Sequence, residues 1–186
     1  MSNIFDIRAY APSSSEYFFF DTNIWMYLYC PLENYNKRTI QPYGQFLGKI
    51  IRAKSTIYIS SLVLSEFYNA YLRLEFNLRR RKNPDRYSDF KRDFRRTGVC
   101  HSLLADITSA VKKQILKLAQ RIDDDFSRIN LGDLFQSIEK SDFNDSYYAT
   151  LAAKKEMAIV TNDRDFIFKG SNVRILTANP HLLRKR

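Results

Sequence analysis

Two aspartates in this sequence each follow a short apolar run. Asp21 comes directly after the aromatic run Tyr17–Phe20, and Asp163 follows the apolar run 157–161. Such runs predict short strands that are buried on both faces, as in the middle of a parallel sheet. Ligands and catalytic groups collect at the carboxyl ends of such strands, so we expect both carboxylates to face one crevice. The alternative for Asp21 is an Asx turn, in which the aspartate only forms the turn.

Two further acids lie in predicted helices among apolar neighbours. Glu66 follows the natural N-caps Ser60 and Ser61 in a helix expected over 62–80, and its helical neighbours are apolar. It is therefore not on an obviously solvated face; the alternative is a glutamate stabilised by the helix dipole. Asp145 lies in the first turns of a helix that runs to about residue 155 and becomes largely apolar.

Asp142 and Asp165 are secondary candidates. Asp142 lies three residues before Asp145 on the same helical face, so it competes with Asp145 for the same role. The Asp-x-x-Asp spacing is also close to a capping box, so Asp142 can simply cap the helix. Asp165 follows the last strand acid closely and can be a turn residue, so we expect it to be at most a helper.

Four or five carboxylates in one crevice repel one another and raise their own pKa values. A hard divalent cation resolves this repulsion. Oxygen ligands, only two histidines and no thiolate cluster favour Mg²⁺ or Mn²⁺ over zinc. With a phosphodiester as substrate, the metal neutralises a phosphate oxygen and lowers the pKa of the attacking water.

The composition indicates one basic domain. The chain has 186 residues, with 30 Lys+Arg against 20 Asp+Glu and a net charge of +10. This excess favours a polyanionic partner, nucleic acid before membrane. The two cysteines and the absence of a signal-peptide pattern predict free thiols in a reducing cytoplasm. The longest apolar stretch is too short to span a bilayer.

Much of the positive charge lies between residues 77 and 96. This segment carries nine basic and three acidic residues, with Tyr87, Phe90 and Phe94 interleaved. Basic side chains can track a nucleic-acid backbone, and aromatic rings can stack on unpaired bases. The alternative is a solvated helix end whose rings pack inward. The candidate nucleic-acid-binding residues are Arg79, Arg80, Arg81, Lys82, Arg92, Arg95 and Arg96.

Helical patterns alternate with short apolar runs along the chain, which predicts an α/β fold: a three-layer α/β/α sandwich with a central parallel sheet. We expect a flexible N-terminal extension over 1–15, one domain over 16–178 with a basic inserted segment at 77–97, and a basic C-terminal tail over 179–186. The expected strands are 17–20, 56–59, 128–130, 157–161 and 173–176, and the expected helices are 23–28, 41–53, 62–80, 101–121, 134–139 and 142–155.

Taken together, these motifs resemble the PIN-domain ribonucleases, of which the toxins of VapBC-type toxin–antitoxin pairs are the best-known small members. The shared pattern is a strand followed by Asp21-Thr22-Asn23, then Ser61-x-x-x-x-Glu66, then Asp145-x-x-x-Ala149, then Val160-Thr161-Asn162-Asp163-x-Asp165. The resemblance spans Tyr17 to Leu176. It implies Mg²⁺- or Mn²⁺-dependent cleavage of single-stranded RNA, with metal ligation by Asp21, Glu66, Asp145 and Asp163. It also implies a homodimer and, for toxins, inhibition by an antitoxin protein.

The leading hypothesis is therefore a metal-dependent endoribonuclease in which Thr22, Asn23 and Thr161 support the acids through hydrogen bonds. A phosphatase with an aspartyl nucleophile is one rival, but that chemistry favours a second acid where Asn23 stands. The other rival is a non-catalytic RNA-binding or scaffold domain that keeps the fold. Charge does not separate RNA from DNA, so a DNA substrate also stays open.

Overall fold

Six parallel strands form the centre of the molecule in the computed structural model, which describes residues 3–31, 36–138, 141–164, 166 and 172–184. Their order across the sheet is β1-β6-β5-β2-β3-β4. This arrangement confirms the predicted α/β fold with a central parallel sheet. The strands are β1 (Ile4–Asp6), β2 (Tyr17–Phe20), β3 (Thr56–Ile59), β4 (Ala119–Arg121), β5 (Ala158–Val160) and β6 (Ile175–Thr177).

Strand β2 is central because its side chains are apolar on both faces. Phe18, Phe19 and Phe20 are fully buried, which matches the expectation for a strand covered by two layers. Phe19 is opposite Tyr58 of β3 on one side and Ile159 of β5 on the other. The order of strands therefore reverses between β2 and β5, and the carboxyl ends of these two strands form the topological switch point of the sheet.

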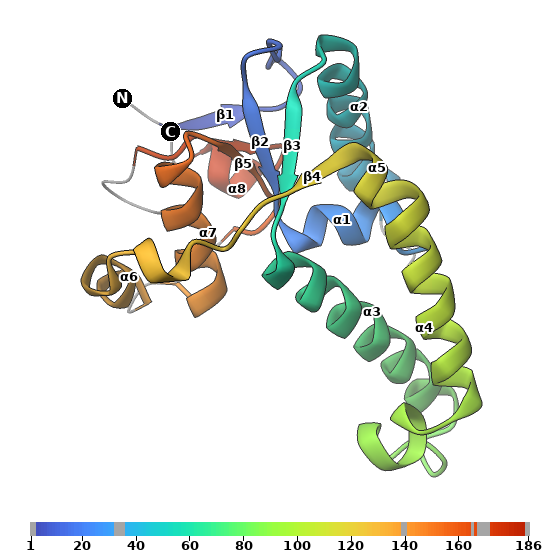
Figure 1. Ribbon diagram of the computed structural model, residues 1–186. Helices are drawn as coiled ribbons and strands as arrows, with labels where there is room; N and C mark the ends of the chain where they lie inside the picture. The colour runs from blue at the N-terminus through green and yellow to red at the C-terminus, as the bar shows by residue number, and fades with distance from the viewer. Residues whose placement is uncertain (1–2, 32–35, 139–140, 165, 167–171, 185–186) are drawn as a thin grey trace.

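The helices follow the strands in sequence and cover the sheet, and Figure 1 shows α3 and α4 extending side by side away from it. None of the described helices is long and apolar enough to cross a membrane. The helices are α1 (Thr22–Tyr29), α2 (Lys37–Ala53), α3 (Ser61–Lys82), α4 (Gly98–Ala110), α5 (Leu116–Leu118), α6 (Leu131–Ile138), α7 (Phe143–Lys154) and α8 (Pro180–Leu183), with the short π-helical or 3₁₀ turns η1 (Lys91–Arg95), η2 (Val111–Ile115) and η3 (Phe126–Arg128).

Both ends of the chain differ from the expectation. Residues 1–15 were expected to be a flexible extension, but Ile4–Asp6 forms β1 and pairs in parallel with β6. Ile7, directly after β1, is fully buried. The expected tail at 179–186 contains α8, which is capped by Asn179 and fully buries Leu182. Both segments are short, and their partners are distant in sequence, so local patterns gave too little signal.

The predicted strand at 128–130 is wrong. The chain forms the 3₁₀ turn η3 there, and the edge strand is β4 at Ala119–Arg121, within the range predicted as helix. The helix predicted over 101–121 is divided in the structure into α4, η2 and α5, which follow one another along the chain. Pairing with β3, in which Ala119 is opposite Ile57, outweighs the local helical pattern at its end.

The basic segment forms the end of a helical arm built from α3, η1 and α4. The rings of Phe76, Phe90 and Phe94 lie 5.4 to 6.0 Å apart, and Phe94 and Tyr87 are buried. Arg73 lies 4.0 Å from the centre of the Phe90 ring. These rings pack inward and stabilise the arm, as the alternative interpretation of the sequence predicted. They are therefore not presented for stacking on bases.

Candidate active site

The ends of β2 and β5 bring the two strand acids to the same edge of the sheet. Phe20 is opposite Val160 in the parallel register, so the two chains leave the sheet side by side. The backbone N–H of Asp21 donates to the Val160 carbonyl at 3.0 Å, which extends the pairing by one residue. Asp21 occupies the N-cap position of α1, and Asp163 follows β5 by three residues.

Asp21 is a buried carboxylate held by two side chains predicted to support it. Its Oδ2 accepts hydrogen bonds from the Thr161 hydroxyl at 2.7 Å and from Asn23 Nδ2 at 2.5 Å. Burial raises the pKa of Asp21 from its ordinary 3.8 to about 7, and the charges of Glu66 and Asp163 add to this rise. The hydrogen bond from Thr161 opposes it.

Thr161 connects the two strand ends. It is fully buried, and its hydroxyl oxygen accepts from Asn23 Nδ2 at 3.2 Å and from the backbone N–H of Asp163 at 3.0 Å. The same hydroxyl donates to Asp21. One side chain therefore sets the position of Asp21 relative to the turn that carries Asp163.

Glu66 lies where three helices meet. Helix α3 begins at a Ser60 cap, whose hydroxyl accepts from the Val63 N–H, and this places Glu66 in the second turn. Glu66 Oε2 accepts from the Thr22 hydroxyl at 2.7 Å and from the Tyr148 hydroxyl at 2.5 Å. Glu66 Oε1 accepts from Asn144 Nδ2. The carboxylate is thus held by donors from α1 and α7.

The structure distinguishes Asp145 from Asp142. Asp142 is exposed at the N-cap of α7, and its Oδ1 accepts from the Asp145 N–H at 2.9 Å, so it caps the helix. Asp145 is half-buried, and burial raises its pKa from 3.8 to about 8. The charges of Asp21, Asp142, Asp163 and Glu66 raise it further. Asp145 therefore lies within electrostatic range of the other three acids.

Asn144 and Tyr148 contribute to the site but were not singled out from the sequence. They are four residues apart on α7 and both donate to Glu66. Burial, followed by the hydrogen bond to Glu66, raises the pKa of Tyr148 well above its usual range, so its hydroxyl stays protonated and donates. The sequence signal that could have identified them is their i, i+4 spacing, which places both polar side chains on one face of a mainly apolar helix.

The four predicted acids are brought together, but they do not form a closed ligand set. Within the described ranges, no group of three or more Asp, Glu, His or Cys side chains is arranged to hold a metal ion. The chemistry of the donors still fits a hard divalent cation, because they are all oxygens and two of them have pKa values raised by burial and mutual repulsion. Asp165 lies outside the described residues.

The basic candidates are not brought to the carboxylates. Arg80 is fourteen residues beyond Glu66 on α3, about 21 Å along the helix axis. Arg79 is paired with Glu75 at 2.7 Å, and Arg92 with Asp93 at 2.6 Å. The remaining five candidates are exposed on the arm: Arg80, Arg81, Lys82, Arg95 and Arg96.

Comparison with known proteins places the chain in a family. The family model of the PIN domain matches residues 18–169. One similar solved structure is VapBC2 from Rickettsia felis bound to a DNA fragment from their promoter, with 22% identity over 86% of this chain and 96% of that chain and a TM-score of 0.49. Another is PAE2754 from Pyrobaculum aerophilum, with 17% identity over 96% and 94% and a TM-score of 0.45. No curated protein matches. The chain belongs to the PIN domain family, whose members are generally nucleases that use divalent metal ions.

Proposed function

We propose that this protein is an endoribonuclease that cleaves single-stranded RNA with the help of Mg²⁺ or Mn²⁺. The observation that carries the proposal is the gathering of Asp21, Glu66, Asp145 and Asp163 at the switch point of the sheet. Burial and mutual repulsion raise the pKa values of Asp21 and Asp145. Such a cluster is stabilised by a cation and suits the binding of a phosphodiester through that cation.

In this proposal the four acids would hold the cation, and a bound cation would supply charge neutralisation at the phosphate and a lowered pKa for water. Thr161 and Asn23 orient Asp21, because both donate to its Oδ2. Thr22 and Tyr148 orient Glu66 by donating to its Oε2. Asp142 positions Asp145 by capping α7, and Asp165 is retained as a helper.

The helical arm is the proposed contact for the rest of the RNA strand. Six of its seven candidate side chains are exposed, and the segment 77–96 carries a net charge of +6, nine basic residues less three acidic ones. Phosphate contacts of this kind position a strand without reading its sequence. Inhibition by an antitoxin protein, pairing of two copies and a cytoplasmic location complete the proposal, and these rest on the motif resemblance.

The test is cleavage of end-labelled single-stranded RNA in Mg²⁺, Mn²⁺ or EDTA, with Asp21→Asn beside the wild type. We expect cation-dependent cleavage that Asp21→Asn abolishes while RNA affinity and the unfolding midpoint stay close to wild type. Asp106→Asn is the matched control, because Asp106 is an exposed acid on α4. Cleavage retained in Asp21→Asn would refute the assignment of the site. RNA binding without cleavage by the wild type would favour the scaffold alternative.

A further inference from the structure

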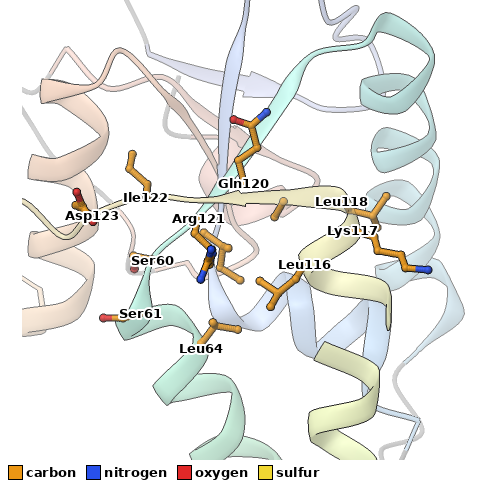
Figure 2. Close-up of a pocket in the computed structure, with 12 residues that line it drawn as sticks. Ser60, Ser61, Leu64, Leu116, Lys117, Leu118, Gln120, Arg121, Ile122 and Asp123 are labelled. Carbon is orange, nitrogen blue, oxygen red and sulfur yellow. The ribbon is translucent and has the colours of Figure 1, made fainter. Parts of the chain in front are cut away.

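A pocket of about 810 Å³ lies beside the edge strand β4, separate from the cluster of carboxylates. Its walls come from the first turn of α3, from α5 and from β4 (Figure 2). Its volume lies in the range of small-ligand sites. The lining combines polar side chains with leucines, so the pocket can receive a ligand that has both a charged and a flat apolar part.

Arg121 is the distinctive residue of this pocket. Side chains alternate along β4, and Ala119, two residues earlier on the same face, is buried. Figure 2 shows Gln120 pointing to one side of the strand and Arg121 to the other, toward Leu64 and Leu116. Within the described part of the chain, the side chain of Arg121 makes no hydrogen bond or ion pair. Its five N–H donors are therefore available to a ligand.

The charge of the pocket favours an anion. Arg121 and Lys117 are both exposed and contribute two positive charges, and Asp123 is the one acid among the residues that line the pocket. A guanidinium binds phosphate through paired N–H donors, which makes arginine a preferred phosphate ligand. Leu64 and Leu116 lie on the side toward which Arg121 points and offer an apolar surface to a base.

The pocket is also connected to the candidate active site. Strands β2 and β4 are separated by β3 alone, so their carboxyl ends lie about 10 Å apart. The Ser61 hydroxyl on the pocket wall donates to Asp124 Oδ2 at 2.5 Å. The Tyr147 hydroxyl donates to the Asp124 carbonyl, which ties the same loop to α7, the helix that carries Asp145. A strand held at the carboxylates can therefore extend to this pocket.

We propose that this pocket binds one nucleotide of the RNA substrate next to the cleaved phosphodiester, with Arg121 on its phosphate and its base against Leu64 and Leu116. This inference rests on the proposed ribonuclease function. It adds a substrate-binding residue outside the four acids and outside the helical arm. It also explains why an exposed arginine without an intramolecular partner stands at the edge of the sheet beside the site.

The experiment compares Arg121→Ala with Arg52→Ala, since Arg52 is an exposed arginine on α2, away from the pocket. Binding of a fluorescent single-stranded RNA is measured by anisotropy with Asp21→Asn added to prevent cleavage. We expect Arg121→Ala to weaken binding roughly 5- to 20-fold and to lower the slope of log affinity against log salt by about 0.7. Arg52→Ala should leave both unchanged, and Arg121→Lys should restore part of the affinity.

Kinetics with the cleaving protein give a second readout. We expect Arg121→Ala to raise KM by a similar factor and to change kcat less than about twofold, because the contact is equal in ground and transition states. The effect should disappear on oligonucleotides too short to reach from the carboxylates to the pocket. Arg121→Gln keeps a long polar side chain and removes only the charge, so it gives the same comparison if the alanine variant fails to fold.

Three results would overturn the inference. Arg121→Ala could bind RNA as tightly as Arg52→Ala, which would leave the pocket to another ligand while wild-type cleavage still supports the proposed function. Arg121→Ala could lower kcat with KM unchanged, which would mean that Arg121 acts on the transition state of cleavage and not on substrate binding. Failure of the wild type to bind or cleave RNA would refute the proposed function itself, and with it this inference.

Discussion

Replacing Thr161 by valine tests the electrostatics of the candidate site. The substitution keeps the shape of a fully buried side chain and removes only its hydroxyl. That hydroxyl donates to Asp21 Oδ2 at 2.7 Å and accepts from the Asp163 N–H at 3.0 Å. The variant therefore leaves a buried carboxylate without one donor and a backbone donor without its acceptor.

The expected loss of stability depends on pH. A hydrogen bond to a charged group contributes about 1.5–3 kcal/mol, and a bond between neutral groups about 1 kcal/mol. The Asp21 carboxyl has a pKa of about 7, and removing the Thr161 hydroxyl raises it further because that bond favours the charged form. We expect Thr161→Val to lower the free energy of unfolding by about 1 kcal/mol at pH 5.5 and by about 2–3 kcal/mol at pH 8.5.

The assay is urea unfolding in EDTA at both pH values, with Thr177→Val as the control. Thr177 is also fully buried at the end of a strand, β6, but its hydroxyl contacts the Tyr43 hydroxyl and the Asn179 N–H instead of a carboxylate. Its replacement should cost stability equally at both pH values. A loss in Thr161→Val that does not grow with pH would refute the reasoning about Asp21.

Four further predictions follow from the same contacts. Without divalent cations, the free energy of unfolding should fall as pH rises from about 5 to 8.5. Folding raises the pKa of Asp21 to about 7 and of Asp145 to about 8, so the protonated carboxyls contribute their full stability only below the ordinary pKa of 3.8 and lose it as pH rises through the raised values. Thermal unfolding in EDTA and in Mg²⁺ checks this, and an unfolding midpoint that rises with pH in EDTA would contradict it. Tyr148→Phe removes a donor to Glu66 and should slow cleavage about tenfold and cost about 1 kcal/mol of stability, measured by RNA cleavage and urea unfolding; unchanged activity would show that this hydrogen bond does not support the site. Alanine at Arg80, Arg81 and Lys82 should weaken RNA binding and lower the salt slope by about 2, measured by anisotropy at several salt concentrations; an unchanged slope would mean that the arm is only a solvated surface. Leu182→Ala should cost about 2–5 kcal/mol in urea unfolding, because Leu182 is the fully buried residue of α8; a loss below about 0.5 kcal/mol would mean that the C-terminal helix is not part of the folded unit.

The sequence by itself determined the central strands, most of the helices and the order of the four acids. The apolar run before Asp21 predicted a strand covered on both faces, and the structure has one there, with Phe18 to Phe20 fully buried. The Ser60 cap and the apolar spacing after it determined where α3 begins and hence where Glu66 lies. These features were readable because each depends on neighbours only a few residues away.

Other features were decided only by the tertiary structure. Strands β1 and β4 are three residues long and exist because they pair with β6 and β3, so local patterns missed both. The sequence favoured Asp145 but left Asp142 as a competitor, and the hydrogen bond from the Asp145 N–H and the burial of Asp145 separated them. Tyr148 and Asn144 became part of the site because the fold brings their side chains on α7 within hydrogen-bonding distance of Glu66 on α3. Contacts between residues distant in sequence carry no local periodicity, so the fold has to be known before they can be seen.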